Sequence, residues 1–332
     1  MGKLYLITGA AGHLGTVLTQ KLLARGDAVR ALLLPGEEPL VPPRVQMVVG
    51  DVTDPASMEP FFRAEGYDAV SLIHCAAVVT IASGEDPAVW RVNVDGTDHV
   101  LRLAQQYGVS RVIYVSSVHA IPERPAPEIM AEPPQFSPGL VRGQYARSKA
   151  AATRLALQAA REGLNISVVH PSGIIGPGDI RGNNHTIRTL RAMAEGRIPV
   201  SIRGGYDFVD VRDVADGILQ CEERGRAGEC YILSSQYCTV RELLETVCRL
   251  QGRRPPRLVV PAFVAGWAAP VVEKLSRLTG RRPVLTPYSV EVLQTNGRYS
   301  HEKATRELGY RPRALTESIR DTLAERNVRE KG

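Results

Sequence analysis

A tyrosine and a lysine four residues apart, Tyr145 and Lys149, are the side chains of this sequence best placed for proton transfer. Of 41 Lys and Arg residues, Lys149 is the only lysine between Lys21 and Lys274. The pair lies in a stretch with helical character (144–160), where residues four apart share one face. An ammonium held near a phenol favours the phenolate, so we expect Lys149 to lower the pKa of Tyr145.

The chemistry of the ammonium group explains why this position carries lysine instead of arginine. A compact ammonium can hold the two hydroxyls of a ribose, whereas a planar guanidinium fits that geometry poorly. A second pair, Tyr299 and Lys303, has the same spacing. It lies in the C-terminal segment, far from the glycine-rich loop described next. We interpret Tyr145–Lys149 as a pair that takes part in the chemistry and Tyr299–Lys303 as a pair with a structural role.

A glycine-rich loop follows the first expected strand. Residues 8–15 read TGAAGHLG, with glycines spaced three apart, and a helix is expected to follow. Glycines let the backbone approach a pyrophosphate, whose charge is stabilised by the helix N-terminus. The alternative is a tight glycine turn without a ligand. The loop residues that we expect at the cofactor are Gly9, Ala11, Gly12, His13, Leu14 and Gly15.

Two further strand ends add candidate cofactor contacts. The sequence GDVTD places Asp51 and Val52 after the third expected strand, where a carboxylate can accept from an adenine amino group. Turn chemistry through Asp51 and Asp54 is the alternative. The sequence HCAA follows the fourth strand with small residues that leave room for a ligand, although small core packing would look the same. Its candidate cofactor contacts are Cys75, Ala76 and Ala77.

The elements that must position these residues alternate between strands and helices. Near-continuous apolar runs predict a parallel sheet covered by helices on both faces, an α/β Rossmann-type doubly wound fold. The strands are expected at 4–7, 29–34, 45–49, 69–74, 112–116 and 166–169.

Beyond residue 172 the alternation weakens, and the proline-rich stretch 121–143 is expected to be a long ordered loop. We therefore predict a dinucleotide-binding domain at 1–172 with a return segment at about 206–235. A smaller, mostly helical substrate domain would comprise 173–205 and 236–332.

The composition bounds the class of protein. With 44% hydrophobic and 23% charged residues, the 332-residue chain is expected to be globular. The net charge of +6 comes with arginines that are scattered apart from short clusters such as Arg253-Arg254 and Arg281-Arg282, so we expect no nucleic-acid partner. Five cysteines without a CxxC pair and an N-terminus without signal-peptide character indicate the cytoplasm. The longest apolar run, 258–272, is too short to span a membrane. The seven histidines show no metal-ligand spacing, so no metal is expected.

Taken in order, these motifs resemble those of the extended short-chain dehydrogenases/reductases. TGAAGHLG, GDVTD, HCAA, NVDGT, YVSS, YARSK, HPSGIIGPGD and FVDVRDVADG follow one another as in that superfamily. The similarity covers essentially the entire chain, including a terminal KATRELGYRPR. Within the superfamily, the sequence looks most like the dihydroflavonol reductase and 3β-hydroxysteroid dehydrogenase branch.

The resemblance implies roles for the matching residues. Ser117 would hydrogen-bond the substrate oxygen and Tyr145 would act there as general acid or base, while Lys149 would orient the ribose. Ser116 competes with Ser117, and strand alternation allows only one of them to face the site. Hydride would pass between the nicotinamide and the substrate carbon. Val115, Pro171 and Ser172 would complete the nicotinamide end of the site.

The choice between NAD and NADP is left open by the second strand. Relatives that use NADP usually place an arginine where this chain has Leu34, and relatives that use NAD place an acid there. We see no acid nearby, and Arg30 and Arg44 are substitutes for the missing arginine. We slightly favour NAD.

Three other activities compete with a dehydrogenase or reductase. Nucleotide-sugar epimerases and dehydratases share the scaffold, but they commonly carry a VYG-like segment where this chain has Val118 and His119. A non-catalytic dinucleotide-sensing regulator would typically lose the Tyr–Lys pair. A Ser-His hydrolase lacks its GxSxG motif here.

We therefore expect an oxidoreductase acting on a secondary alcohol or ketone. The apolar run around Phe263 and Trp267 would suit an apolar substrate, although a buried structural helix would look identical. The resemblance also implies a homodimer through helices near 88–107 and 144–162.

Overall fold

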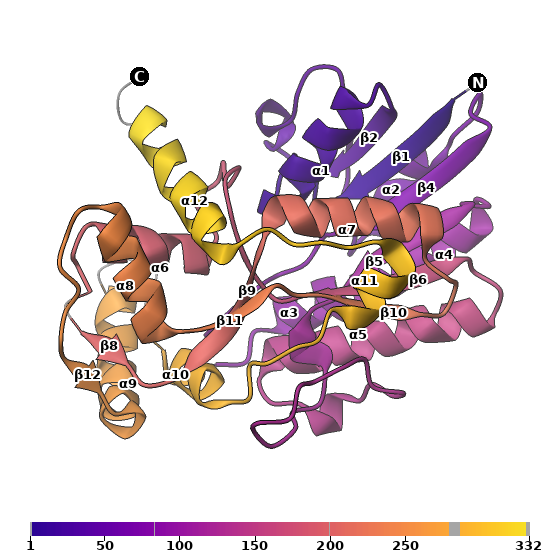
Figure 1. The fold of residues 1–332 in the computed structure, drawn as a ribbon. Coiled ribbons are helices and arrows are strands. Elements are labelled where there is room, and N and C mark those ends of the chain that lie inside the picture. Colours follow the sequence, from indigo (N-terminus) through magenta and orange to yellow (C-terminus); the bar gives the residue numbers. More distant parts are fainter. Residues whose placement is uncertain (1, 83, 199, 279–285, 330–332) are drawn as a thin grey trace.

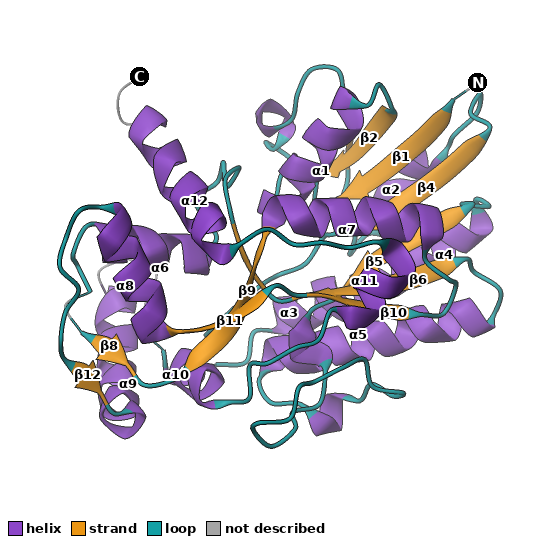
Figure 2. Ribbon diagram, viewed as in Figure 1, coloured by secondary structure: helices purple, strands orange, loops and turns teal. Residues whose placement is uncertain are grey.

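The computed structural model describes residues 2–82, 84–198, 200–278 and 286–329. The predicted parallel sheet is confirmed as the main layer (Figures 1 and 2). It has seven strands, one more than the six expected, in the order β10-β6-β5-β4-β1-β2-β3. The strands are β1 (Lys3–Thr8), β2 (Ala28–Leu33), β3 (Gln46–Val49), β4 (Ala69–His74), β5 (Arg111–Val115), β6 (Ile166–Pro171) and β10 (Cys230–Leu233).

Two hydrophobic clusters cover the two faces of this sheet. Along β1, Leu4 and Leu6 belong to one cluster while Tyr5 and Ile7 belong to the other. Burial on both faces explains why the strands read as continuous apolar runs instead of alternating ones. One face carries α1 (His13–Ala24) and α7 (Val211–Arg224), and the other carries α2 (Pro55–Phe62), α4 (Gly96–Gln106) and α5 (Gln144–Arg161).

Local sequence signals define the helix ends. The Asp54 side chain accepts a hydrogen bond from the Ala56 N–H at the start of α2, with Pro55 at the first helical position, as predicted. Gly26 follows α1 with φ +83°, a left-handed conformation that favours glycine. Between β4 and α4 lie α3 (Pro87–Trp90) and a π-helical turn, Arg91–Asp95. The segment 121–143 is a loop with one short 3₁₀ turn, Pro138–Leu140, as expected.

The remaining elements form a mostly helical region at one end of the sheet (Figure 2). Two small sheets lie there, one of order β11-β9-β7 and one pairing β12 with β8. Their strands are β7 (Gly173–Ile175), β8 (Ser201–Ile202), β9 (Gly205–Asp210), β11 (Gln236–Thr239) and β12 (Val259–Val260). The helices of this region are α6 (His185–Ala194), α8 (Val240–Leu250), α9 (Ala262–Leu278), α10 (Pro287–Gln294) and α12 (Leu315–Arg329), whereas α11 (Glu302–Leu308) packs on α7 and β10.

The C-terminal chain returns to the main sheet before it ends. Ala304 and Leu308 of α11, together with Tyr310, are buried in the same cluster as α1 and α7. The last segments therefore connect the helical region with the dinucleotide half. The division into domains at the residues given above stays a prediction.

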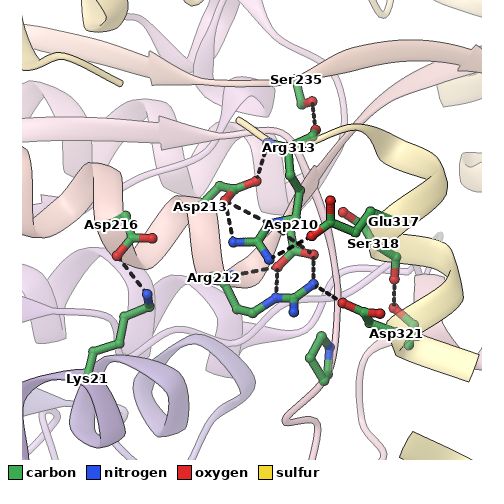
Figure 3. Close-up of polar contacts among 12 residues, drawn as sticks. Lys21, Asp210, Arg212, Asp213, Asp216, Ser235, Arg313, Glu317, Ser318 and Asp321 are labelled. Atoms are coloured by element: carbon green, nitrogen blue, oxygen red, sulfur yellow. Dashed lines mark hydrogen bonds and ion pairs between the residues drawn. The ribbon is translucent and has the colours of Figure 1, made fainter. Parts of the chain in front are cut away.

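Ion pairs hold the C-terminal segment against α7 and β9 (Figure 3). Arg313 donates from its guanidinium and from its backbone N–H to Asp213 of α7, at 2.8–2.9 Å. Arg212 binds both oxygens of Asp210, which is buried at the end of β9, and also binds Asp321 of α12 at 2.8 Å. Bidentate pairs between guanidinium groups and buried carboxylates are among the stronger polar contacts. They connect β9, α7 and α12.

We expect Arg313→Ala to lower the free energy of unfolding by about 1–3 kcal/mol, because it leaves the buried Asp213 carboxylate without its charged partner. Urea denaturation followed by circular dichroism measures this loss. The matched control is Arg306→Ala, which removes an exposed guanidinium paired with Glu307 and should change stability by less than about 0.5 kcal/mol. Equal effects of the two variants would contradict a stabilising role for the Arg313–Asp213 pair.

Candidate active site

The loop after β1 is shaped for close approach to an anion. Gly9 has φ +69°, and a Cβ there would lie 2.8 Å from the Ala76 nitrogen, so this loop touches the HCAA segment after β4. A Cβ on Gly15 would lie 2.2 Å from the Gly9 carbonyl oxygen. Gly12 precedes α1 and has no side chain to cap it, which leaves the first N–H groups of the helix for a ligand.

His13 holds this loop against a distant segment. Its Nε2 donates to the Pro177 carbonyl at 3.0 Å, and its Nδ1 accepts from the Asn184 amide at 3.1 Å. Burial lowers the pKa of His13, so the ring is neutral and each nitrogen has one role. His13 was predicted as a cofactor contact, and its side chain here supports the loop.

The segment after β4 is tied to the helix that carries Tyr145. Asn93 accepts from the Val78 N–H at 2.8 Å and donates to the Val78 carbonyl and to Ser148 Oγ, both at 3.0 Å. Ser148 lies on α5, so one amide group connects this loop, the π-helical turn and α5. We did not predict this role, although the NVDGT motif contains the residue and was the available signal.

Thr8 and His74 form a second support at the same place. His74 contacts Thr8 Oγ1 through Nδ1 at 2.7 Å and Thr97 Oγ1 through Nε2 at 3.0 Å. Thr8 Oγ1 in turn accepts from the Ala76 N–H at 3.2 Å. These buried contacts fix the end of β4, where Cys75 and Ala77 were predicted to face the cofactor.

The two serines after β5 point in different directions. Ser116 Oγ bonds Thr153 Oγ1 of α5 at 2.7 Å inside the protein. Ser117 Oγ accepts from the His119 N–H at 3.2 Å and lies close enough to Tyr145 to lower the pKa of its phenol. The structure thus places Ser117, the serine that we favoured, beside the tyrosine.

Lys149 is buried and points to the end of β5. Its Nζ donates to the Val115 carbonyl at 2.8 Å and lies 3.5 Å from the Tyr114 hydroxyl. Burial lowers the pKa of Lys149 to about 8. At neutral pH the group still carries its charge most of the time.

The expected lowering of the Tyr145 pKa is wrong. Burial raises this pKa to about 12, and the nearby Ser117 hydroxyl offsets only part of the rise. The physical reason is that removal of the phenol from water disfavours the phenolate. The Lys149 ammonium meanwhile points to the Val115 carbonyl. Tyr145 is therefore a neutral phenol at physiological pH.

An aromatic cluster lies next to Tyr145. His119 stacks on Tyr206 with ring centroids 5.6 Å apart and meets the Tyr145 ring edge-on at 5.8 Å. Its Nε2 is 3.1 Å from the Tyr206 hydroxyl, and burial lowers its pKa to about 4. Tyr288 of α10 completes the cluster, with its ring 6.4 Å from His119. Sequence reasoning found His119 but missed both tyrosines, which no motif marks.

A cavity of about 360 Å³ opens beside this cluster. It combines apolar side chains from the loop after β5 and from α10 with a few charged ones. It is lined by Val118, His119, Ile121, Glu123, Arg124, Pro125, Leu140, Val141, Arg142, Ala146, Tyr288, Glu291, Val292, Thr295 and Tyr299. The run around Phe263 and Trp267, which we expected either at the substrate or in a buried helix, lies on exposed positions of α9 instead.

The predicted contacts after β2 and β3 also lie at the carboxyl ends of the parallel strands. They are at the end of the strand order that is opposite to β6 and β10. Asp51 accepts from the Thr53 N–H at 2.8 Å, the contact of the turn alternative. Val52 packs against Gly96. Pro171 ends β6, and Ser172 follows it as a buried residue.

The statement that no acid lies near Leu34 is wrong. The Leu34 N–H donates to Glu37 at 3.1 Å, and Glu37 is buried and paired with Arg181 at 2.5 Å. The turn after β2 folds back, which brings an acid from three residues downstream to the strand end. Arg30, a suggested substitute for the missing arginine, donates to the backbone and to Gln46 instead.

In the part of the chain that the structure describes, no cluster of three or more His, Cys, Asp or Glu residues is arranged to hold a metal ion. None of its helices combines the length and apolar character needed to cross a membrane.

The sheet order and the loop between β1 and α1 define a dinucleotide-binding protein of the Rossmann class. Residues 5–233 match the family model described as "NAD dependent epimerase/dehydratase family", and the chain belongs to this family. The predicted superfamily is confirmed, and a nicotinamide dinucleotide is the cofactor of the family. The glycine loop and the uncapped helix N-terminus fit such a cofactor.

Individual proteins similar to this chain fall in the same group. "Sterol demethylase protein B" of Methylococcus capsulatus is 33% identical, with 96% of this chain and 97% of the relative covered. A "Putative dihydroflavonol 4-reductase" of Synechocystis sp. is 31% identical, with 97% and 94% covered. The crystal structure of gox2253 superposes with a TM-score of 0.83 at 30% identity, covering 100% of this chain and 98% of the other.

We expect Gly15→Ala to abolish dinucleotide binding, because the added methyl group would collide with the backbone of Gly9 and Ala10. Isothermal titration with NADH and NADPH measures the loss. Gly84→Ala is the control, since a Cβ there meets nothing within 4 Å. Unchanged affinity in a folded Gly15→Ala protein would contradict the assignment of this loop.

Proposed function

We propose that this protein is an NAD(P)-dependent oxidoreductase acting on a secondary alcohol or ketone of apolar character. The observation that carries the proposal is that Ser117 lies next to Tyr145, close enough to lower the pKa of its phenol, while Lys149 of the same helix is buried at the end of β5. Tyr145 also meets His119, which lines a cavity of aromatic, aliphatic and charged groups. The named activities of the two relatives, one acting in sterol demethylation and one a putative dihydroflavonol reductase, support the same class of substrate.

In this proposal the substrate oxygen accepts hydrogen bonds from Ser117 Oγ and from the Tyr145 hydroxyl. The cofactor supplies or takes up the hydride at the adjacent carbon. Tyr145 gives its proton to the oxygen as the carbonyl is reduced and takes it back in the reverse direction. A pKa of about 12 keeps the phenol protonated at neutral pH, the state that a proton donor to the carbonyl oxygen needs.

The proposed role of Lys149 is to hold the nicotinamide ribose. Its ammonium is fixed by the Val115 carbonyl and lies close to Cys75 at the end of β4. His170 contacts the Ser117 carbonyl at 3.0 Å through Nδ1 and steadies the neighbouring backbone. Proton donor, oxygen-binding hydroxyl and ammonium thus meet at the carboxyl ends of β4, β5 and β6, where α/β proteins bind their ligands.

We favour NAD(H) over NADP(H). The buried Glu37 carboxylate at the end of β2 supports this choice, because an acid there can accept from a ribose 2′-hydroxyl and would repel a 2′-phosphate. Arg181 partly neutralises that carboxylate, so both dinucleotides belong in the test.

A nicotinamide-absorbance screen tests the proposal, with NADH and NADPH against steroidal, aromatic and aliphatic ketones and with UDP-sugars included. Conversion of a UDP-sugar without net absorbance change would favour an epimerase, the alternative that the family description suggests. Tight dinucleotide binding without turnover of any class would favour a regulator. The homodimer and the cytoplasmic location stay predictions.

We expect Tyr145→Phe to bind the dinucleotide normally and to reduce turnover by roughly 10²–10⁴-fold, because the proton donor is removed while the ring stays. Steady-state kinetics with the best ketone from the screen provide the measurement. Tyr107→Phe, which alters a tyrosine stacked on Phe62 away from the site, is the control. Near-normal turnover of Tyr145→Phe would refute the mechanism.

Dinucleotide affinity should fall as the pH rises through about 8. Burial lowers the pKa of Lys149 from 10.5 to about 8, so its charge is present below that pH and is lost above it. At pH 9 roughly tenfold weaker binding of NADH is expected if the ammonium is required. Fluorescence titration across this range measures the trend. Lys149→Met should bind weakly with a flat pH profile, and a flat profile in the wild type would contradict the role of Lys149.

A further inference from the structure

Helix α9 has the reverse of the usual arrangement of small and large apolar side chains. Among its described side chains, Ala265 and Ala269 are buried and form a small cluster with Val290 of α10. Three large apolar ones face outward: Phe263 is 67% exposed, Trp267 83% and Val271 59%. A helix stabilised by the fold alone would turn these large groups inward.

The outward residues form a continuous stripe. Phe263, Trp267 and Val271 are spaced four apart and share one helix face, and the neighbouring Val264 of the same helix is 43% exposed. We call these four residues the α9 stripe. Contiguous apolar patches of this kind mark interaction sites on proteins. The helix lies at the outer edge of the helical region, beside α10 (Figure 1).

The sequence before and after the stripe is strongly basic. Between residues 253 and 282 the sequence has seven Lys and Arg residues and one Glu. Their balance of +6 equals the formal net charge of the entire chain, so the rest of the protein is neutral overall. Among the described members, Arg253, Arg254, Arg257 and Lys274 are exposed.

We propose that the α9 stripe docks on an anionic phospholipid bilayer, with α9 lying in the plane of the interface. Trp and Phe side chains partition into the headgroup region, and flanking basic groups bind anionic lipids. α9 has 17 residues and is too short to cross a membrane, so the helix would lie on the bilayer instead of spanning it.

The positive charge near the α9 stripe disfavours a second copy of this chain as its partner, and the exposed aromatic side chains disfavour a nucleic acid. A second copy of this chain would bring two strongly basic surfaces together around the stripe, which costs electrostatic free energy. A nucleic acid would satisfy the basic groups but would leave the exposed Phe263 and Trp267 in contact with a charged phosphate backbone.

The location also suits an apolar substrate, an extension that rests on the proposed function. α10 packs on α9 through Val290 and supplies Tyr288, Glu291 and Val292 to the cavity beside Tyr145. Docking through the stripe would therefore hold the cavity close to the phase in which an apolar ketone dissolves.

Vesicle flotation of the full chain tests the proposal. We expect it to float with vesicles of phosphatidylcholine and phosphatidylglycerol at low salt, and to stay behind with phosphatidylcholine alone or at high salt. The double variant Phe263→Ser/Trp267→Ser should bind at least roughly tenfold more weakly, and so should Arg253→Gln/Arg254→Gln/Arg257→Gln. Ile129→Ser, which alters a side chain that is also 67% exposed, is the matched control.

Fluorescence places the helix directly. In a Trp90→Phe background the emission of Trp267 should shift to the blue with anionic vesicles and be quenched by brominated lipids. Vesicle binding that the double variant leaves unchanged would overturn the proposal. So would a dimer that Trp267→Ser converts to a monomer without any vesicle binding, or binding to duplex DNA that exceeds binding to vesicles.

The vesicle-binding tests can be evaluated separately from the proposed catalytic activity. The double variant should keep wild-type dinucleotide affinity and, with a water-soluble ketone in the absence of vesicles, wild-type turnover. Vesicle binding by a protein without turnover would reject the proposed function alone, and turnover without vesicle binding would reject the docking surface alone.

Discussion

The hydrogen bond from the Lys149 ammonium to the Val115 carbonyl is the contact on which the candidate site depends. It joins α5 to the end of β5, and the next residues along that chain include Ser117. Because Tyr145 lies one helical turn before Lys149, fixing the lysine also fixes the phenol beside the serine. Asn93 supports the same helix from the other side through Ser148.

This arrangement places a cation in the interior of the protein, where desolvation opposes the charge. The same burial lowers the pKa of Lys149 to about 8 and raises that of Tyr145 to about 12. Both groups therefore keep the protonated state at neutral pH, one as a cation and one as a neutral donor. The geometry and the protonation states have a single cause, the close packing of α5 on the sheet.

Much of the fold could be predicted from the sequence because its signals are local. Strands buried on both faces must be apolar throughout, and the turns between them need glycine or an aspartate cap, as at Gly26 and Asp54. The alternation of side chains along a strand separates Ser117 from Ser116. These rules need no knowledge of distant contacts.

The errors concern properties that depend on distant contacts. The Tyr145 pKa depends on how much protein covers the phenol, which helical spacing does not reveal. Glu37 reaches the end of β2 because of a turn geometry that its sequence neighbours do not specify. Tyr206 and Tyr288 meet His119 from β9 and α10, elements far apart in the chain.

The exposure of the α9 stripe is another property that could not be predicted from the sequence, because it depends on how α9 packs against α10. Composition alone is equally compatible with a buried helix and with an exposed one, and both expectations for this run placed it inside. What distinguishes the two is which residues are small: Ala265 and Ala269 allow close contact with α10, and that contact turns Phe263 and Trp267 outward. An apolar face that the fold leaves uncovered must meet water or another phase. The concentration of the chain's net positive charge in the sequence segment that contains this face, residues 253–282, favours an anionic surface.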